Sequence, residues 1–182
     1  MVNKSRSLRT QVTMAVLIGI ASILHAVEGL VPSLPVPGAK LGLANTATLI
    51  GLRILGFWAA LGISLFRSFI GGLFGGSLFG PAFFMSFAGA ISSALAMGFV
   101  SKVKNIGNNL IFVSVIGAIT HSLAQIMVAS KLLNHSGIWY YLPFLMGLST
   151  LTGIFIGIVC EKVIALLPAT MKPEGNSQNK LH

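Results

Sequence analysis

Ionisable side chains inside or at the end of long apolar runs need a buried partner or a ligand. Arg67 is near the middle of the run 57–73, and His25 and Glu28 lie at the end of the run 12–30. An ionised side chain at the centre of a bilayer costs about 2.5–3.5 kcal/mol on insertion scales, so Arg67 must face other helices. It is either structural, as part of an ion pair or as a side chain that snorkels toward the membrane surface, or a counter-ion for a bound ligand.

Two further polar patterns follow helical spacing. His25 and Glu28 are three residues apart and share one helix face, either as an edge of an outward-facing pocket or as a pair at the membrane interface. In the run 110–129, a small or polar stripe is spaced i, i+4, i+7 and i+11: Ser114, Ala118, His121 and Gln125. Such a stripe does not favourably face lipid, so it predicts hydrogen bonds between helices or contacts with a ligand. Asn45 and Thr48 form a weaker pair of this kind.

A second face of the first run consists of small residues at the same i, i+4, i+7 and i+11 spacing: Ala15, Gly19, Ser22 and Ala26. Small residues allow another helix to approach closely. The spacing alone leaves open whether that helix belongs to this chain or to a partner protein.

Residues needed for several common chemistries are missing from the sequence. It contains no aspartate, and its acids are Glu28, Glu161 and Glu174. Prenyl diphosphate synthases of the usual kind bind magnesium diphosphate through clustered aspartates, because hard cations require several carboxylate oxygens. The sequence also lacks a Walker-type ATP motif, and it has one cysteine, Cys160. We therefore predict no catalytic residue, no cofactor and no metal site in this chain.

Composition places these residues in a membrane. Of 182 residues, 54% are hydrophobic and 8% are charged, whereas soluble domains carry about 25% charged residues. Lipid must be the solvent for most of the chain. Six apolar runs predict an all-α, polytopic bundle of six transmembrane helices, the second of them short: 12–30, 41–52, 57–73, 79–100, 110–129 and 142–167. The predicted organisation is a basic N-terminus (1–10), a transmembrane domain (11–168) and a disordered cytoplasmic tail (169–182).

The basic residues predict the orientation. The formal net charge is +9, but the cations lie between apolar runs and act as topology signals rather than as a nucleic-acid surface. Apart from Arg67, which lies within a run, nine Lys and Arg residues are inside when the N-terminus is in the cytoplasm, and only Lys40 and Lys131 are outside. Trp139, Tyr140 and Tyr141 would then lie at the outer interface. We expect a multi-pass protein of the cell membrane.

One string in the sequence is fairly specific. The segment 37–45 reads PGAKLGLAN and follows a first run that ends near Glu28. In this string the chain resembles the Gx transporter family, which is also called heptaprenyl diphosphate synthase component I. Supporting likenesses are the region 65–67, the His121 and Gln125 stripe, and the sequence YYLP at 140–143. The resemblance covers roughly residues 10–168.

That family resembles the substrate-binding S components of energy-coupling-factor transporters, which are six-helix proteins that bind a vitamin-like solute near the outer face. The resemblance implies that the segment 31–40 is a gating loop. It also implies that the face of Ala15, Gly19, Ser22 and Ala26 docks on a transmembrane coupling protein with ATPase subunits, although S components often carry Ala where this chain has Gly19. The synthase name implies instead an association with menaquinone side-chain synthesis.

The leading hypothesis is a substrate-binding subunit of a transporter for a vitamin-like or quinone-precursor-like solute. Its pocket would be lined by Glu28, Lys40, Asn45, Arg67, His121 and Gln125. Lys40 and Arg67 would attract an anionic or carbonyl-bearing group, and Glu28 would accept hydrogen bonds or pair with Lys40. The alternative is a non-catalytic membrane subunit that associates with a prenyl synthase catalytic chain. A structural membrane anchor, the third possibility, would pair Arg67 with His121.

Overall fold

Six α-helices and one short 3-10 helix make up the described part of the chain, which comprises residues 2–30, 40, 42–168 and 171. They are α1 (Val2–Leu30), α2 (Asn45–Leu55), α3 (Phe57–Phe74), α4 (Pro81–Val100), α5 (Leu110–Leu132), η1 (Ser136–Tyr141) and α6 (Leu142–Leu166). This computed structural model confirms the predicted all-α bundle. The residues that it describes form no β-strand.

Five of the helices are long and apolar enough to cross a membrane: α1, α3, α4, α5 and α6. At 1.5 Å per residue, the 11 residues of α2 rise about 16 Å, against a hydrocarbon core of about 30 Å. The helix α2 therefore cannot cross the core alone, in keeping with the short second run. The helix α1 begins at Val2, upstream of the predicted run, because no glycine or proline interrupts residues 2–11.

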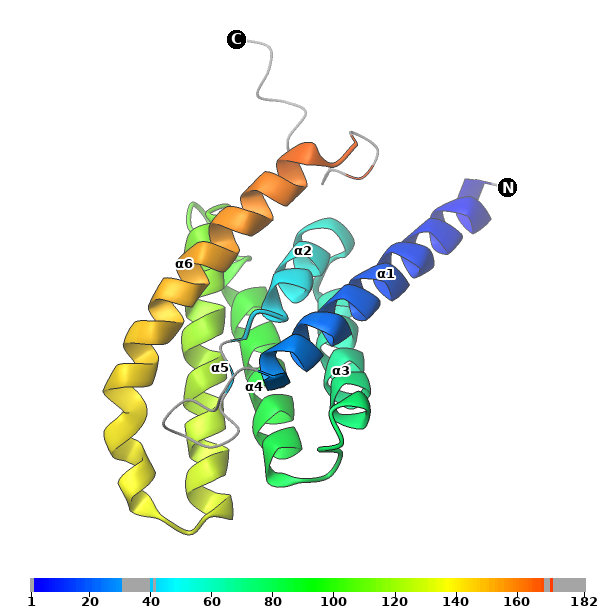
Figure 1. The fold of residues 1–182 in the computed structure, drawn as a ribbon. Helices are drawn as coiled ribbons and strands as arrows, with labels where there is room; N and C mark the ends of the chain where they lie inside the picture. The colour runs from blue at the N-terminus through cyan, green and yellow to red at the C-terminus, as the bar shows by residue number, and fades with distance from the viewer. Residues whose placement is uncertain (1, 31–39, 41, 169–170, 172–182) are drawn as a thin grey trace.

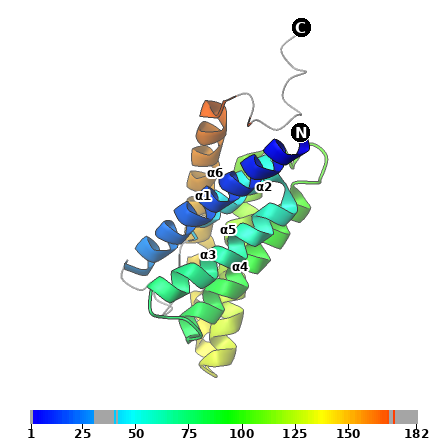
Figure 2. The ribbon, with the colours of Figure 1, turned by 90° about the vertical axis from the view of Figure 1, so that its right-hand side faces the viewer.

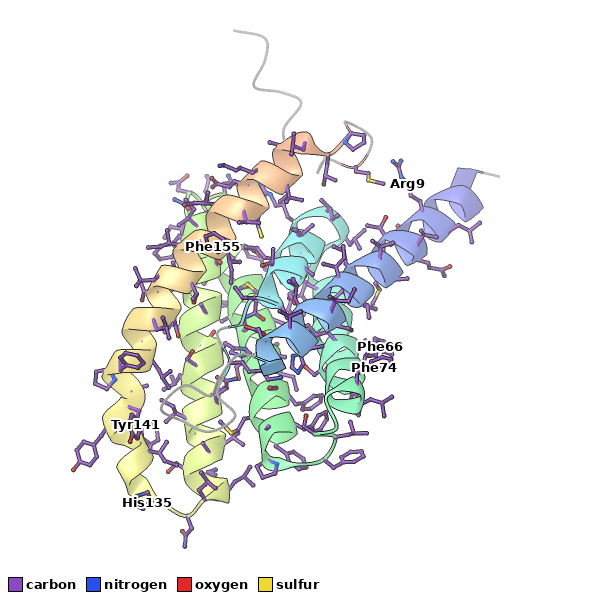
Figure 3. All side chains as sticks on the ribbon, in the orientation of Figure 1. Arg9, Phe66, Phe74, His135, Tyr141 and Phe155 are labelled. Atoms are coloured by element: carbon purple, nitrogen blue, oxygen red, sulfur yellow. The ribbon has the colours of Figure 1, made fainter. Side chains whose placement is uncertain are left out.

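Large apolar side chains cover the outer surface of the bundle, as expected where lipid is the solvent. Phe74 is 81% exposed and Phe66 also projects away from the neighbouring helices (Figure 3). At the other side of the molecule, Tyr141 ends η1 and is exposed as well (Figure 3). These surfaces identify a multi-pass membrane protein.

Glycine and proline set the helix ends near the α3–α4 connection. The helix α3 ends at Phe74, and Gly75 and Gly76 form the turn that follows it. The helix α4 begins at Pro81, where the missing N–H of proline removes no helical hydrogen bond. The glycines thus end α3, and α4 begins two residues after the start of the predicted run 79–100.

The helices α3, α4, α5 and α6 follow one another up and down, whereas α1 leans obliquely across the bundle (Figures 1 and 2). The helix α1 packs against α2 and α3, and α2 also contacts α4, α5 and α6. The short helix α2 therefore lies at the centre of the assembly. The start of α1 and the end of α6 lie at the same end of the bundle (Figure 1).

The core consists of two apolar clusters. One lies toward the start of α1 and the end of α6 and includes Leu17, Ile63, Val113 and Ile156. The other lies at the opposite end and includes Met85, Ile126, Ala129, Ile138 and Leu145. Along α4, α5 and α6, buried polar residues occupy the positions between the two clusters, among them Ser93, His121 and Ser149. A polar layer therefore separates two apolar layers.

Candidate ligand site

Seven side chains from four helices and the segment before α2 meet in this polar layer, and we call them the polar cluster: His25, Glu28, Lys40, Asn45, Arg67, His121 and Gln125. Lys40 is half-buried, and the other six are at most 7% exposed. All six residues predicted to line a pocket belong to it. Polar groups buried this deeply need hydrogen-bond partners, because a missing partner costs about 1–3 kcal/mol.

Arg67 projects from the middle of α3 and is 1% exposed. Its Nη2 donates a hydrogen bond to Oδ1 of Asn45, 2.6 Å away, at the start of α2. The side chain of Asn45 is itself buried. This contact fixes the guanidinium between two helices, as the position of Arg67 in its apolar run predicted.

His25 and Glu28 both turn inward from the last turns of α1, as their shared face predicted. Oε1 of Glu28 accepts a hydrogen bond from the backbone N–H of Leu43, at 2.6 Å. The ammonium nitrogen of Lys40 lies 2.8 Å from Nε2 of His25. The lysine therefore contacts the imidazole. Of the two roles expected for Glu28, accepting hydrogen bonds or pairing with Lys40, the first is the one that the described contacts contain.

The predicted stripe on α5 faces the interior: Ser114, Ala118, His121 and Gln125 are all buried. Oε1 of Gln125 accepts a hydrogen bond from the backbone N–H of Lys40, at 3.3 Å. This bond ties the segment before α2 to α5. The stripe thus takes part in the polar cluster.

His121 lies against two glycines. A Cβ built on Gly89 of α4 would stand 2.8 Å from both Cε1 and Nδ1 of the ring, so only glycine permits this approach. A Cβ on Gly42 would be 3.7 Å from Cδ2 of His121 and 3.1 Å from Nδ2 of Asn45. His121, Asn45 and Arg67 therefore converge on one region. The pair between Arg67 and His121 that a structural anchor predicts is not found among the described residues.

Several buried atoms of the polar cluster have no hydrogen-bond partner among the described residues. They are Nε of Arg67, Nδ2 of Asn45, Nε2 of Gln125, and both ring nitrogens of His121. Most buried polar groups in native proteins are paired, so a concentration of unpaired atoms in one place needs an explanation. A bound ligand would supply the missing partners.

Burial and neighbouring charges also act on Lys40, which lies outside the five long apolar helices. Burial lowers the pKa of its ammonium group, the carboxylate of Glu28 raises it, and the guanidinium of Arg67 lowers it again. Burial is the largest of these effects, so the pKa lies below its usual value. The site thus disfavours the charged form of this lysine unless an anion joins it.

The small-residue face of α1 divides into two parts. Ala15 and Gly19 are exposed, and no described atom lies within 4 Å of a Cβ built on Gly19. Ser22 is buried and donates to the backbone carbonyl of Ile18, and Ala26 is half-buried. Only the first part of this face is therefore open to a partner helix.

Sequence reasoning missed the polar residues of α4. Ser86 and Ser93 are buried, and neither hydroxyl has a partner within the described part of the chain. They are seven residues apart with Gly89 between them, so helical spacing could have revealed this face. Ser122 and Ser149, 2.5 Å apart, also join α5 to α6 within the polar layer.

Fold and site together define a polytopic membrane protein with a buried, partly unpaired polar cluster. The chain belongs to the heptaprenyl diphosphate synthase component I family, whose model matches residues 17–163. No curated protein and no solved structure matches the chain. The proposed gating loop, apart from Lys40, and nearly all of the predicted C-terminal tail lie outside the described residues.

Proposed function

We propose that this protein is a non-catalytic membrane component of a prenyl diphosphate synthase. The family match over residues 17–163 carries the proposal. The sequence adds that no aspartate is available to bind magnesium diphosphate, so a separate catalytic chain would supply the chemistry. The membrane component would hold that chain at the bilayer, where an apolar product of this kind partitions.

Co-expression tests this proposal. We expect a catalytic prenyl synthase chain to co-purify with this protein from detergent, and heptaprenyl diphosphate formation to require both chains. The control is the catalytic chain with an unrelated six-helix membrane protein. A catalytic chain that stays in the soluble fraction, with the same product and rate in either case, would rule the proposal out.

A second candidate function is a substrate-binding component of a transporter, and the polar cluster favours it. Its buried, unpaired atoms are suited to a small polar solute inside the bundle, which a scaffold for another protein does not need. The partner would then be a transmembrane coupling protein with ATPase subunits, which could contact the exposed Ala15 and Gly19. The solute would be vitamin-like or a quinone precursor.

In either setting we propose that the polar cluster is a ligand site, lined by Glu28, Lys40, Asn45, Arg67, His121 and Gln125. We also propose that the N-terminus lies in the cytoplasm, which puts the cluster in the outer half of the cell membrane. Native mass spectrometry of detergent-purified protein tests the site. We expect a co-purified small molecule that is lost in Arg67→Ala and kept in Arg53→Ala.

Arg53 is a control for the loss of a helical arginine, because it is only half-buried and bonds to Asn108 at the opposite end of the fold. Both variants must insert and elute as single species. If Arg67→Ala retains the molecule at the wild-type level, the arginine is structural and the ligand site is elsewhere.

A further inference from the structure

The hydrogen-bond partners of Asn45 and Gln125 show which end of each side-chain amide is the oxygen and which is the NH₂ group. The carbonyl oxygen of Asn45 receives an N–H from Arg67, and that of Gln125 receives the backbone N–H of Lys40. Only the oxygen of an amide accepts hydrogen bonds, so these contacts fix both side chains. The ends left unpaired are therefore the NH₂ groups, which are donors.

Besides the NH₂ groups of Asn45 and Gln125, Nε of Arg67 is an unpaired donor. Asn45, Arg67 and Gln125 are each at most 3% exposed, so water does not readily satisfy them. Three buried donors from α2, α3 and α5 thus lack an acceptor among the described residues. A ligand that fills this region must therefore offer acceptor atoms to these three donors. Neutral His121 adds one unpaired donor nitrogen and one unpaired acceptor nitrogen beside them.

The formal charges limit the ligand further. Arg67 and Lys40 are cations and Glu28 is the one acid of the cluster, which leaves a formal charge of +1 with neutral histidines. One negative charge on a ligand balances this excess in a medium of low dielectric constant. A diphosphate would bring two or three charges and leave the site negative, which is unfavourable away from water.

We propose that the polar cluster binds its ligand through a single carboxylate group and discriminates against diphosphates. This inference rests on the proposed ligand site and names the class of its ligand. A carboxylate has two oxygens with about four lone-pair positions, enough for the three unpaired donors. A water-soluble acid and a fatty acid of the membrane both carry this group, and the experiment below distinguishes them.

Three probes that each join an apolar chain to a different polar group test the inference. They are added to the full-length protein in a carboxylate-free detergent. They are octanoate, its neutral analogue octanamide, and geranyl diphosphate. The midpoint of thermal unfolding is measured as a function of the concentration of each probe. We expect octanoate to raise the unfolding midpoint with saturation, and the other two to have no saturable effect. Mass spectrometry of the extracted ligand then shows whether the native acid is water-soluble or lipid-derived.

Asn45→Asp is the decisive variant. It keeps an acceptor for Arg67 while it removes the unpaired NH₂ and brings the formal charge to zero, so it should fold. We expect this variant to bind octanoate about tenfold more weakly or worse, because the carboxylate loses one hydrogen bond. Gln125→Glu acts in the same way on α5. Arg53→Gln, at the opposite end, should bind like the wild type.

The outcomes separate this inference from the ligand site itself. If geranyl diphosphate stabilises the protein and octanoate does not, the site is correct and the carboxylate assignment is wrong. Equal binding of octanoate and octanamide, or octanoate binding unchanged in Asn45→Asp, overturns the assignment as well. If no probe stabilises the protein and no small molecule co-purifies, the proposed ligand site fails.

Discussion

The guanidinium of Arg67 and the side-chain carbonyl of Asn45 form a 2.6 Å hydrogen bond that joins α3 to α2 inside the bundle. The helix α2 is too short to cross the membrane alone, so its position depends on contacts of this kind. A second contact, between the hydroxyls of Thr48 and Ser64 at 3.0 Å, joins the same two helices. The polar cluster therefore both holds α2 and forms the candidate site.

The first prediction concerns this bond. In Asn45→Ala the buried guanidinium loses the acceptor of its Nη2, and we expect a loss of about 3 kcal/mol or more in stability. The double variant Asn45→Ala/Arg67→Met removes the charge as well and should be more stable than the single variant. Thermal unfolding in detergent measures both. A double variant that is less stable than Asn45→Ala would mean that the charge itself stabilises the bundle.

Local patterns in the sequence predicted the helices well and the contacts less well. The lengths of the apolar runs depend on neighbouring residues only, so five long helices and a short one could be anticipated. The spacing of His25 and Glu28 identified their common face. It did not determine which of them Lys40 would contact, because that depends on how a distant segment folds over α1.

The second prediction uses two glycines in helices. Gly89→Ala would place a methyl group 2.8 Å from the ring of His121, so the ring must move. Gly147→Ala in α6 meets no atom within 4 Å and should be neutral or slightly stabilising, by up to about 1 kcal/mol. We expect Gly89→Ala to weaken ligand retention, measured by native mass spectrometry, while Gly147→Ala retains the ligand. Equal retention would place the ligand away from His121.

The third prediction tests the orientation with the chain's single cysteine. Cys160 is fully buried, with its thiol 3.6 Å from the carbonyl oxygen of Thr46, so it should react slowly with maleimides. In a Cys160→Ser background, we expect Lys104→Cys to be labelled only after the membrane is permeabilised. His135→Cys, exposed at the other end, should be labelled in intact cells. The reverse pattern would mean that the N-terminus lies outside.

The last prediction concerns the pH dependence of stability that arises from Lys40. Burial lowers the pKa of this ammonium group below the 10.5 that it has when unfolded. Between the two pKa values the unfolded chain binds more protons than the folded one, so stability rises with pH in that interval. Below the folded pKa both states are protonated, and the cost of burying the charge is constant.

We therefore expect the wild type to gain stability relative to Lys40→Met as the pH increases through the folded pKa toward 10.5. The two proteins share every other titrating group, so the difference between their unfolding midpoints isolates the lysine and its coupling to His25, Glu28 and Arg67. Lys131→Met, which removes an exposed lysine, is the matched control and should follow the wild type. If the wild type instead loses stability relative to Lys40→Met as the pH rises, the site stabilises the ammonium, and Lys40 is held by an anion already present.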